Sequence, residues 1–152
     1  MLEGLTPLRI PIVRLASSEL ALPAYFSAGA SGMDLSAAVS EPVVIGPAEF
    51  RLIPCGIAVA IPEGFEGQIR PRSGLATRDG VTVLNAPGTI DSDYRGEVKV
   101  LLINLGTTAF TVVAGMRVAQ LVIGPVARVE WESTASLPGS RRGTGGFGHT
   151  GA

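Results

Sequence analysis

The stretch VVIGPAEFRLIPCGIAVAIPEG, residues 43–64, determines the fold class of this chain. It holds three short runs of β-branched and aliphatic residues, at 43–45, 50–54 and 56–61, with glycine and proline between and after them. Apolar runs of this length, bounded by glycine and proline, are typical of strands joined by turns. The stretch therefore predicts consecutive β-strands.

The same pattern continues on both sides of this stretch. Further strands are expected at residues 8–15, 66–70, 81–84, 97–104, 110–113, 118–123 and 127–131. Only residues 73–78 are expected to form a turn or so of helix. The 20 glycines and 11 prolines of the chain fit a turn-rich β fold and argue against a helical bundle. The sequence predicts an all-β sandwich, jelly roll or barrel.

The composition indicates a single soluble domain. The 152 residues are 46% hydrophobic and 16% charged, which is ample material for one core. The formal net charge of -1 and the lack of a polybasic run argue against a nucleic-acid or membrane-surface partner. The opening MLEGLTP lacks the features of a signal peptide, and no stretch approaches the roughly 20 apolar residues that span a bilayer. We expect a cytoplasmic protein.

Cys55 is the only cysteine in the chain. It cannot form an intrachain disulfide, and a lone cysteine without neighbouring ligands is not a zinc site. Because it lies in the apolar run at residues 52–57, we expect a buried and chemically inert thiol.

Residues 85–99, NAPGTIDSDYRGEVK, crowd two aspartates, a tyrosine, two cations and an amide before an apolar strand. Polar groups in this position suit a loop held by a rigid scaffold, and such loops usually carry the binding and catalytic residues. We single out Asp91 as a candidate general base. The alternative is that Asp91 and Asp93 are ordinary turn residues, since aspartate favours turns.

Two further segments carry groups that suit an anion. Residues 71–76, PRSGLA, open the expected helix, so Ser73 and free N–H groups lie beside the charge of Arg72. Residues 28–35, AGASGMDL, form a glycine-rich loop that ends on the lone acid Asp34. Each signal is weak alone, and the second segment also fits a simple turn followed by a strand.

Residues 137–152, LPGSRRGTGGFGHTGA, differ from the rest of the chain. This glycine-rich segment cannot bury a core, so we expect it to be flexible when nothing is bound. It contains Gly-x-Gly-x-x-Gly, but no strand-then-helix unit can follow it, which rules out a dinucleotide fold. Arg142 and Phe147 among glycines suit a closing flap that clamps an anion and stacks on a ring. The alternative is a disordered tail.

Five segments of the chain occur in one order. They are residues 28–35, residues 71–76, residues 85–97, RVAQL at 117–121 and RGTGGFG at 142–148. Together they resemble the five motifs of the trimeric deoxyuridine triphosphate nucleotidohydrolase (dUTPase) family. The resemblance covers the chain from about residue 8 to the C-terminus. It outweighs the alternative that each segment is only a turn or a disordered tail.

The resemblance implies an architecture and a reaction. The fold would be a distorted jelly-roll β-barrel at residues 1–136 with a flexible arm at 137–152. Three chains would form a homotrimer with active sites at subunit interfaces. The reaction would convert dUTP and water to dUMP and pyrophosphate with Mg²⁺. This reaction keeps uracil out of DNA and supplies dUMP for dTMP synthesis.

The resemblance also implies residue roles. Asp91 would activate the attacking water, and Asp34 would steady the magnesium through bound water. Tyr94 would lie under the deoxyribose and exclude a 2′-hydroxyl. The implied substrate-binding residues are Arg72, Ser73, Gly74, Asn85, Thr89, Ile90, Asp91, Tyr94, Lys99, Gln120, Arg142, Phe147 and Gly148.

Other positions near these motifs receive smaller roles. Arg117 and Arg95 are expected to brace loops by ion pairs, and Arg141 could share the clamp of Arg142. His149 receives no role.

Two other functions stay open. The related dCTP deaminase has a similar fold, but the pattern GTIDSDY and the tail RGTGGFG favour the dUTPase. A β-barrel interaction module that binds nucleotide without turnover is the second alternative. It has no support in the sequence, because every motif residue is present.

Overall fold

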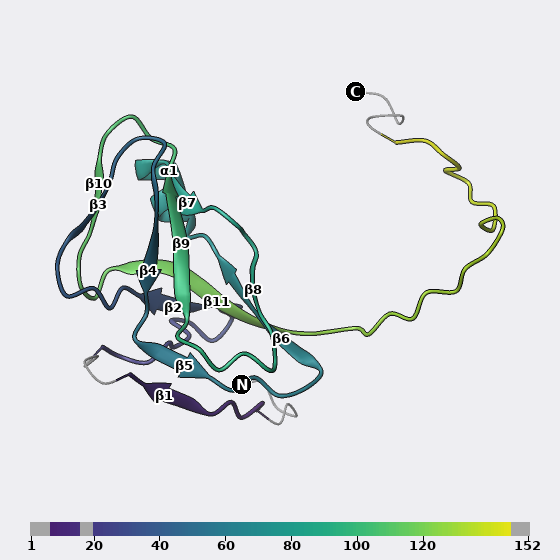
Figure 1. Cartoon of the computed structure of the whole chain (residues 1–152), viewed down its shortest axis with the longest axis horizontal. Helices are drawn as coiled ribbons and strands as arrows, with labels where there is room; N and C mark the ends of the chain where they lie inside the picture. The colour runs from purple at the N-terminus through teal and green to yellow at the C-terminus, as the bar shows by residue number, and fades with distance from the viewer. Residues whose placement is uncertain (1–6, 16–19, 147–152) are drawn as a thin grey trace.

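The computed structural model describes residues 7–15 and 20–146, and this part folds as strands with one short helix (Figure 1). The expected all-β fold is confirmed. In chain order the elements are β1 (Ile12–Arg14), β2 (Met33–Ser36), β3 (Val43–Ile45), β4 (Phe50–Pro54), β5 (Ile57–Val59), β6 (Phe65–Arg70), α1 (Ser73–Asp79), β7 (Val81–Val83), β8 (Gly88–Ile90), β9 (Lys99–Asn104), β10 (Phe110–Val112) and β11 (Arg117–Pro125).

The strands form four sheets in which every pairing is antiparallel. The strand orders are β1-β5, β10-β3, β4-β9-β7 and β2-β11-β6-β8. The four-stranded sheet brings together segments that are far apart in the sequence. It carries most of the candidate site, because all four of its strands overlap or adjoin the motif segments.

The core forms where alternate residues of each strand point inward. In β9, Val100 and Leu102 are completely buried, whereas Lys99 is exposed. Burying a valine or leucine side chain stabilises the fold by about 1.5–3 kcal/mol. Val100 and Leu102 therefore lie on the face of β9 that turns toward the core, while Leu101 and Ile103 between and after them are only partly buried.

Asn104 at the end of β9 is the one buried polar side chain among the described residues. Its Nδ2 group donates to the carbonyl oxygens of Ile45 at 2.9 Å and Thr108 at 2.8 Å. Its Oδ1 accepts from the N–H of Gly106 at 2.9 Å. A buried amide satisfied in this way ties the end of β9 to the end of β3 and to the loop that follows β9.

The expected helix is present as α1 and ends where the sequence supplies a glycine. Gly80 has a φ of 68°, a left-handed conformation that favours glycine at a helix C-terminus. A Cβ atom at this position would also lie 2.7 Å from the backbone nitrogen of Gly106. Both constraints stop the helix after Asp79.

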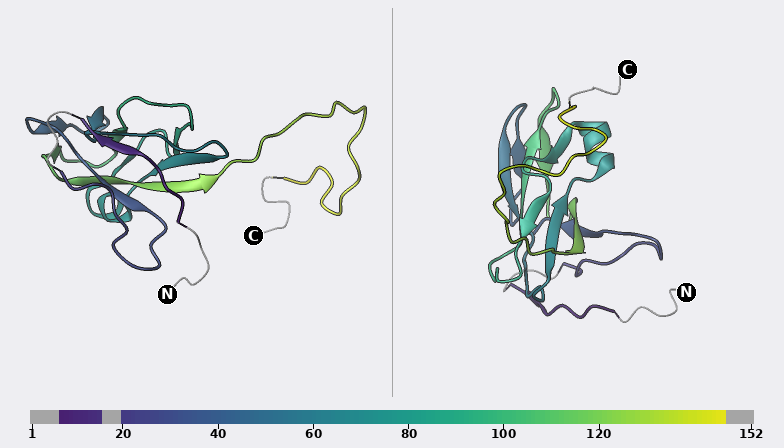
Figure 2. Two further views of the ribbon diagram at one scale, coloured as in Figure 1. Left: turned by 90° about the horizontal axis from the view of Figure 1, so that it is seen from below. Right: turned by 90° about the vertical axis from the view of Figure 1, so that its right-hand side faces the viewer.

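Three strand predictions need correction. Residues 33–36 lie in or next to the segment interpreted as a glycine-rich loop, yet they form β2 against β11. Residues 127–131 were expected to form a strand, but β11 ends at Pro125 and the described chain beyond it is irregular. A strand requires a partner for its backbone groups, and this segment leaves the folded body with Trp131 91% exposed (Figure 2). Conversely, residues 88–90 lie in the segment interpreted as a loop, yet they form β8 against β6.

The prediction for Cys55 is confirmed. The side chain is 4% exposed, and burial, with a smaller contribution from Glu97, raises the pKa of the thiol to about 12. A thiol with so high a pKa is a poor nucleophile near neutral pH. None of the helices in the described part of the chain has the length and apolar character needed to cross a membrane.

Candidate active site

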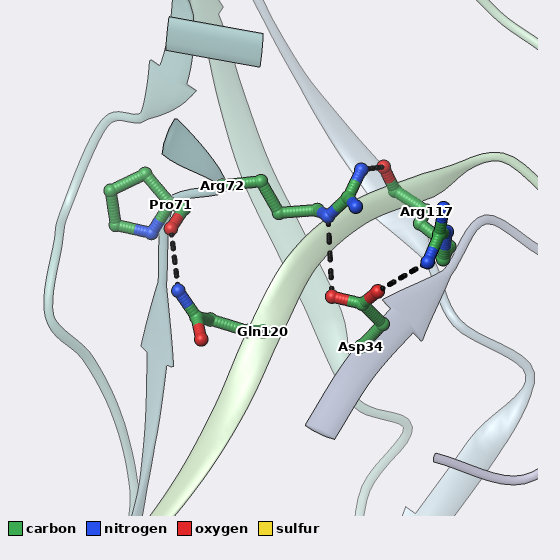
Figure 3. Close-up of polar contacts among 5 residues, drawn as sticks. All are labelled: Asp34, Pro71, Arg72, Arg117 and Gln120. Atoms are coloured by element: carbon green, nitrogen blue, oxygen red, sulfur yellow. Dashed lines mark hydrogen bonds and ion pairs between the residues drawn. The ribbon is translucent and has the colours of Figure 1, made fainter. Parts of the chain in front are cut away.

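The carboxylate of Asp34 on β2 lies between two arginines (Figure 3). Oδ1 accepts a hydrogen bond from Nε of Arg72 at 3.2 Å, and Oδ2 accepts one from Arg117 at 3.0 Å. Arg72 also donates to the backbone oxygen of Arg117 at 3.2 Å. These contacts join residues from β2, from the start of α1 and from β11. The ion pair expected of Arg117 is present, but it joins the paired strands β11 and β2 rather than bracing a loop.

Gln120 on β11 belongs to the same group of side chains. In the sheet it lies directly opposite Asp34 on one side and Arg70 on the other, so the three side chains share a face. Its Nε2 donates to the carbonyl oxygen of Pro71 at 3.0 Å (Figure 3). Gly32 leaves space for this side chain, because a Cβ atom there would collide with Oε1 of Gln120.

Ser73 and Gly74 follow Arg72 as the first residues of α1. Both are exposed, and a Cβ atom at Gly74 would meet open space. Within the described residues, no side chain caps the start of this helix. The first N–H groups of a helix lack partners within it, so these amides are free to meet a bound anion. We refer to Asp34, Arg72, Ser73, Gly74, Arg117 and Gln120 as the arginine cluster.

A second group of candidate residues lines a hollow of about 270 Å³. Six sequence-predicted residues lie there, namely Asn85, Thr89, Ile90, Asp91, Tyr94 and Lys99. Apolar walls come from Leu52, Ile69 and Val98. The antiparallel strands β7 and β9 form a wide hairpin, and residues 84–98 between them include β8 and the turn that follows it. We call this the hairpin hollow, because that segment supplies most of its lining. Its mixture of apolar walls and a few polar groups is typical of small-molecule sites.

Glu97 links the hairpin to neighbouring loops, a role that sequence reasoning missed. Its Oε1 accepts a hydrogen bond from the N–H of Gly56 at 3.0 Å, and its Oε2 lies 3.6 Å from Nζ of Lys99. The hydroxyl of Tyr94 donates to the backbone oxygen of Glu97 at 2.9 Å. Glu97 therefore holds two lining residues of the hairpin hollow.

Arg95 braces the same hairpin in a different way from the one expected. Its NH1 donates to the carbonyl oxygens of Ser92 at 2.6 Å and Tyr94 at 2.8 Å. None of the ion pairs formed by residues 7–15 and 20–146 involves Arg95. The arginine stabilises the turn through backbone carbonyls, so the predicted ion pair is corrected to these hydrogen bonds.

Phe26 also contacts the arginine cluster, and nothing in the sequence predicts this contact. Its ring centroid lies 4.9 Å from Cζ of Arg117, within the range of a cation–π contact. The loop that carries Phe26 precedes β2, so only the folded chain shows that the ring and the guanidinium meet.

Asp91 and Arg72 lie beyond opposite ends of β6. Ile90 of β8 lies opposite Gly67, and because the strands are antiparallel, Asp91 continues toward the start of β6. Arg72 follows the other end of β6, two residues after Arg70. The strand between Gly67 and Arg70 is about 10 Å long at roughly 3.3 Å per residue.

The two groups are also separated across the sheet. Asp34 lies on β2 at one edge, and Asp91 follows β8 at the other edge. Three strand spacings of about 4.8 Å separate these edges by about 14 Å. Asp91 also lines a second hollow, of about 920 Å³, together with Phe65 and Glu66 from the start of β6. One chain therefore does not bring Asp91 to the arginine cluster.

Arg142, the one C-terminal candidate among the described residues, is not part of either group. Arg142 is exposed, and its Nε donates to the carbonyl oxygen of Gly145 at 2.7 Å. It lies on the segment that leaves the folded body after β11 (Figures 1 and 2). Phe147, Gly148 and His149 fall outside the described residues.

The residues around Asp34 fit magnesium only if a ligand supplies oxygens. Among residues 7–15 and 20–146, no three acidic, histidine or cysteine side chains are grouped to hold an ion. Mg²⁺ usually keeps several waters and is bound through one or two carboxylates plus substrate phosphates. A single carboxylate such as Asp34, beside groups that suit phosphate, fits that mode of binding.

Comparisons with known proteins show which family this chain belongs to. The dUTPase family matches residues 18–151. The deoxyuridine 5′-triphosphate nucleotidohydrolase of Rhizobium leguminosarum bv. trifolii is 59% identical over 143 residues, which is 92% of each chain. The enzyme of the same name from Rickettsia felis is 51% identical over 147 residues, covering 97% of this chain and 99% of that protein.

Solved structures show the same fold. The Staphylococcus bacteriophage 80alpha dUTPase with dUpNHpp superimposes with a TM-score of 0.85 at 25% identity, covering 95% of this chain and 99% of that one. A mutant dUTPase from phage phi11 of S. aureus, described with a structural Mg(II) ion, gives a TM-score of 0.75 at 24% identity over 85% and 98% of the two chains. The chain belongs to the dUTPase family.

Proposed function

We propose that this enzyme hydrolyses dUTP to dUMP and pyrophosphate with Mg²⁺ bound to the substrate. Family membership and the names of the relatives support the reaction. The observation that carries the proposal is the grouping of six predicted residues around the hairpin hollow. These residues are spread over residues 85–99, and the fold turns all of them toward one space.

The hairpin hollow is the site for the base and sugar. Asn85 and the backbone of the hairpin read the edge of uracil, and Tyr94 lies under the deoxyribose. A lost attraction to one methyl group is worth only about 1–3 kcal/mol, so thymine is excluded by collision with rigid backbone. The buried Gly88 and Ile90 of β8, paired with β6, provide that rigidity.

The arginine cluster is the site for the phosphates. Arg72, the amides of Ser73 and Gly74, and Gln120 bind phosphate oxygens, because charge-assisted hydrogen bonds are the strong ones. Asp34 holds Mg²⁺ through bound water. When bound, the ion supplies positive charge that neutralises the phosphates.

Asp91 aligns and activates the water that attacks the α-phosphorus. Proton removal by one carboxylate supplies only part of the rate, typically 10²–10⁴-fold. Positioning of the water and electrostatic stabilisation of the phosphates supply the rest. Asp91 is exposed and lines both hollows, so water reaches it from solvent.

The active site is shared between subunits of a homotrimer. Reacting groups must approach to about 3–3.5 Å, whereas Asp91 and Asp34 lie at opposite edges of one sheet. Asp91 of one subunit therefore acts on phosphates held by the arginine cluster of another. An apolar surface on β4 supports assembly, because Phe50 and Leu52 are 55% and 57% exposed in the single chain.

Residues 137–152 form the arm that closes the site, and 1–136 form the jelly-roll barrel. The arm carries Arg142 to the γ-phosphate, while Phe147 and Gly148 cover the uracil. The exposed course of the described part of this segment, away from the folded body, is compatible with contact to another subunit (Figure 1). In the cytoplasm, the reaction keeps uracil out of DNA and supplies dUMP for dTMP synthesis.

Product analysis across nucleoside triphosphates tests the proposal. We expect pyrophosphate and dUMP from dUTP, with much slower release from dTTP, UTP and dCTP. Ammonia from dCTP would instead identify a deaminase, and tight dUTP binding with neither product would identify a binding module. Either result would overturn the proposed function.

A further inference from the structure

The ring of Tyr94 occupies the space that a side chain at Gly96 would need. A Cβ atom built at Gly96 would lie 2.6 Å from Cζ of Tyr94 and 3.0 Å from Cε2, and it would also collide with the hydroxyl. All three of its nearest neighbours belong to this one ring. Real Cβ atoms do not approach so closely, so any side chain at position 96 must displace the tyrosine.

The backbone does not explain why glycine stands at this position. Glycine is favoured where φ is positive, as at Gly64 and Gly80 with φ values of 85° and 68°. Gly96 is not among the positive-φ glycines of the described chain. An alanine could adopt the same backbone conformation, so the need for glycine comes from the Tyr94 ring.

Few other contacts hold this ring. Tyr94 is 44% exposed, and its hydroxyl donates to the backbone oxygen of Glu97 at 2.9 Å. The ring is thus fixed at its far end by one hydrogen bond across the turn, and it lies where Gly96 has no side chain. It lines the hairpin hollow together with Asn85 and Asp91.

We propose that Gly96 is a positioning residue that sets the discrimination between deoxyribonucleotide and ribonucleotide. This inference rests on the proposed function, in which Tyr94 lies under the deoxyribose. A ring can reject a 2′-hydroxyl only if it cannot move away, because rejection by collision requires a rigid wall. Gly96 and the Glu97 carbonyl keep the ring against the hairpin, and a side chain at position 96 would swing it outward.

The test compares kcat/KM for dUTP with kcat/KM for UTP in the full-length chain. In Gly96→Ala we expect the dUTP-to-UTP ratio to fall at least roughly tenfold, mainly through faster use of UTP. Gly124→Ala is the matched control, because a Cβ atom there meets nothing within 4 Å. Its ratio should equal that of the natural chain. General damage to the fold would slow both substrates together and leave the ratio unchanged.

A double-mutant cycle shows whether Gly96 acts through the ring. Tyr94→Ala removes every atom that the new side chain would strike, so it should lower the ratio by itself. Adding Gly96→Ala to Tyr94→Ala should then change the ratio less than about twofold. A further fall in the double variant would show that Gly96 acts on something else and would overturn the proposal.

Two other results separate the possible failures. A ratio within about twofold of the natural value in folded Gly96→Ala would overturn the proposal while leaving dUTP hydrolysis intact. Absence of pyrophosphate release from dUTP by the natural chain would instead reject the proposed function itself.

If Gly96→Ala does not fold, the Tyr94→Phe variant provides the test, because it removes only the hydrogen bond to the backbone oxygen of Glu97. The proposal requires Tyr94→Phe to lower the ratio, and an unchanged ratio would refute it.

Discussion

Mixing two inactive variants should restore activity if each site takes Asp91 from one subunit and Arg72 from another. Asp91→Asn removes the carboxylate that activates water and should slow hydrolysis at least about a hundredfold. Arg72→Ala removes a phosphate-binding guanidinium, while Asp34 keeps its ion pair with Arg117 at 3.0 Å. Both variants should therefore fold and both should be nearly inactive.

The expected recovery follows from the positions of the two residues. They lie beyond opposite ends of β6, and Asp91 is about 14 Å across the sheet from the edge that carries Asp34. In oligomers assembled at random from equal amounts of the two variants, a site receives an unmutated Asp91 from one subunit with a probability of one half. It receives an unmutated Arg72 from the other subunit with the same probability. About one quarter of the sites are then complete.

The assay is pyrophosphate release from dUTP after the two variants are unfolded and refolded together. Each variant refolded alone is the control, and the natural chain treated in the same way defines full activity. We expect about one quarter of that activity in the mixture. If both residues acted within one chain, no subunit would hold a complete pair. Activity no higher than the mean of the two controls, in assemblies shown to contain both variants, would refute the shared site.

Three further predictions concern the arm, the thiol and the core. Deleting residues 139–152 should leave the oligomer assembled but nearly inactive, as measured by light scattering and pyrophosphate release; full activity would rule out a role for the arm. Burial raises the pKa of Cys55 from 9.0 to about 12. Between these two pH values the thiol ionises in the unfolded chain but not in the folded one, and this stabilises the unfolded state. Urea unfolding should show stability falling as the pH rises above 9.0, and Cys55→Ala should lack that fall. Leu102→Ala, at a completely buried position of β9, should lower the free energy of unfolding by about 2–5 kcal/mol in urea titrations; a loss below about 1 kcal/mol would contradict its place in the core.

Local composition predicted the strands that carry apolar runs. β9 was expected from the continuous apolar residues 100–103, but only the folded chain shows that Val100 and Leu102 are the ones that turn fully inward. β8 was missed because it is three residues long, begins with glycine and owes its existence to pairing with β6. Residues 127–131 have the composition of a strand, but no described strand pairs with them. Strand formation depends on a partner as well as on composition.

The candidate residues were predictable as a set, but their grouping was not. The ordered motifs pointed to Asp34, Arg72 and Asp91 together. Nothing in the spacing shows that Asp34 pairs with Arg117, which is 83 residues away, or that Asp91 lies apart from both. Such relations depend on sheet order and register, which long-range pairing determines. The division of one expected site into two separated groups is visible only in the folded chain.

The charges around Asp34 give a reason why the arm would close only on a bound substrate. Arg72 and Arg117 carry two positive charges and Asp34 one negative charge, which leaves a surplus of about one positive charge, and Arg70 on the same face adds another. A triphosphate brings about four negative charges, so about two would remain uncompensated. A bound magnesium ion would balance these two. Without substrate, the positive surplus would repel Arg142, so the arm would gain electrostatically by closing only once a triphosphate is bound.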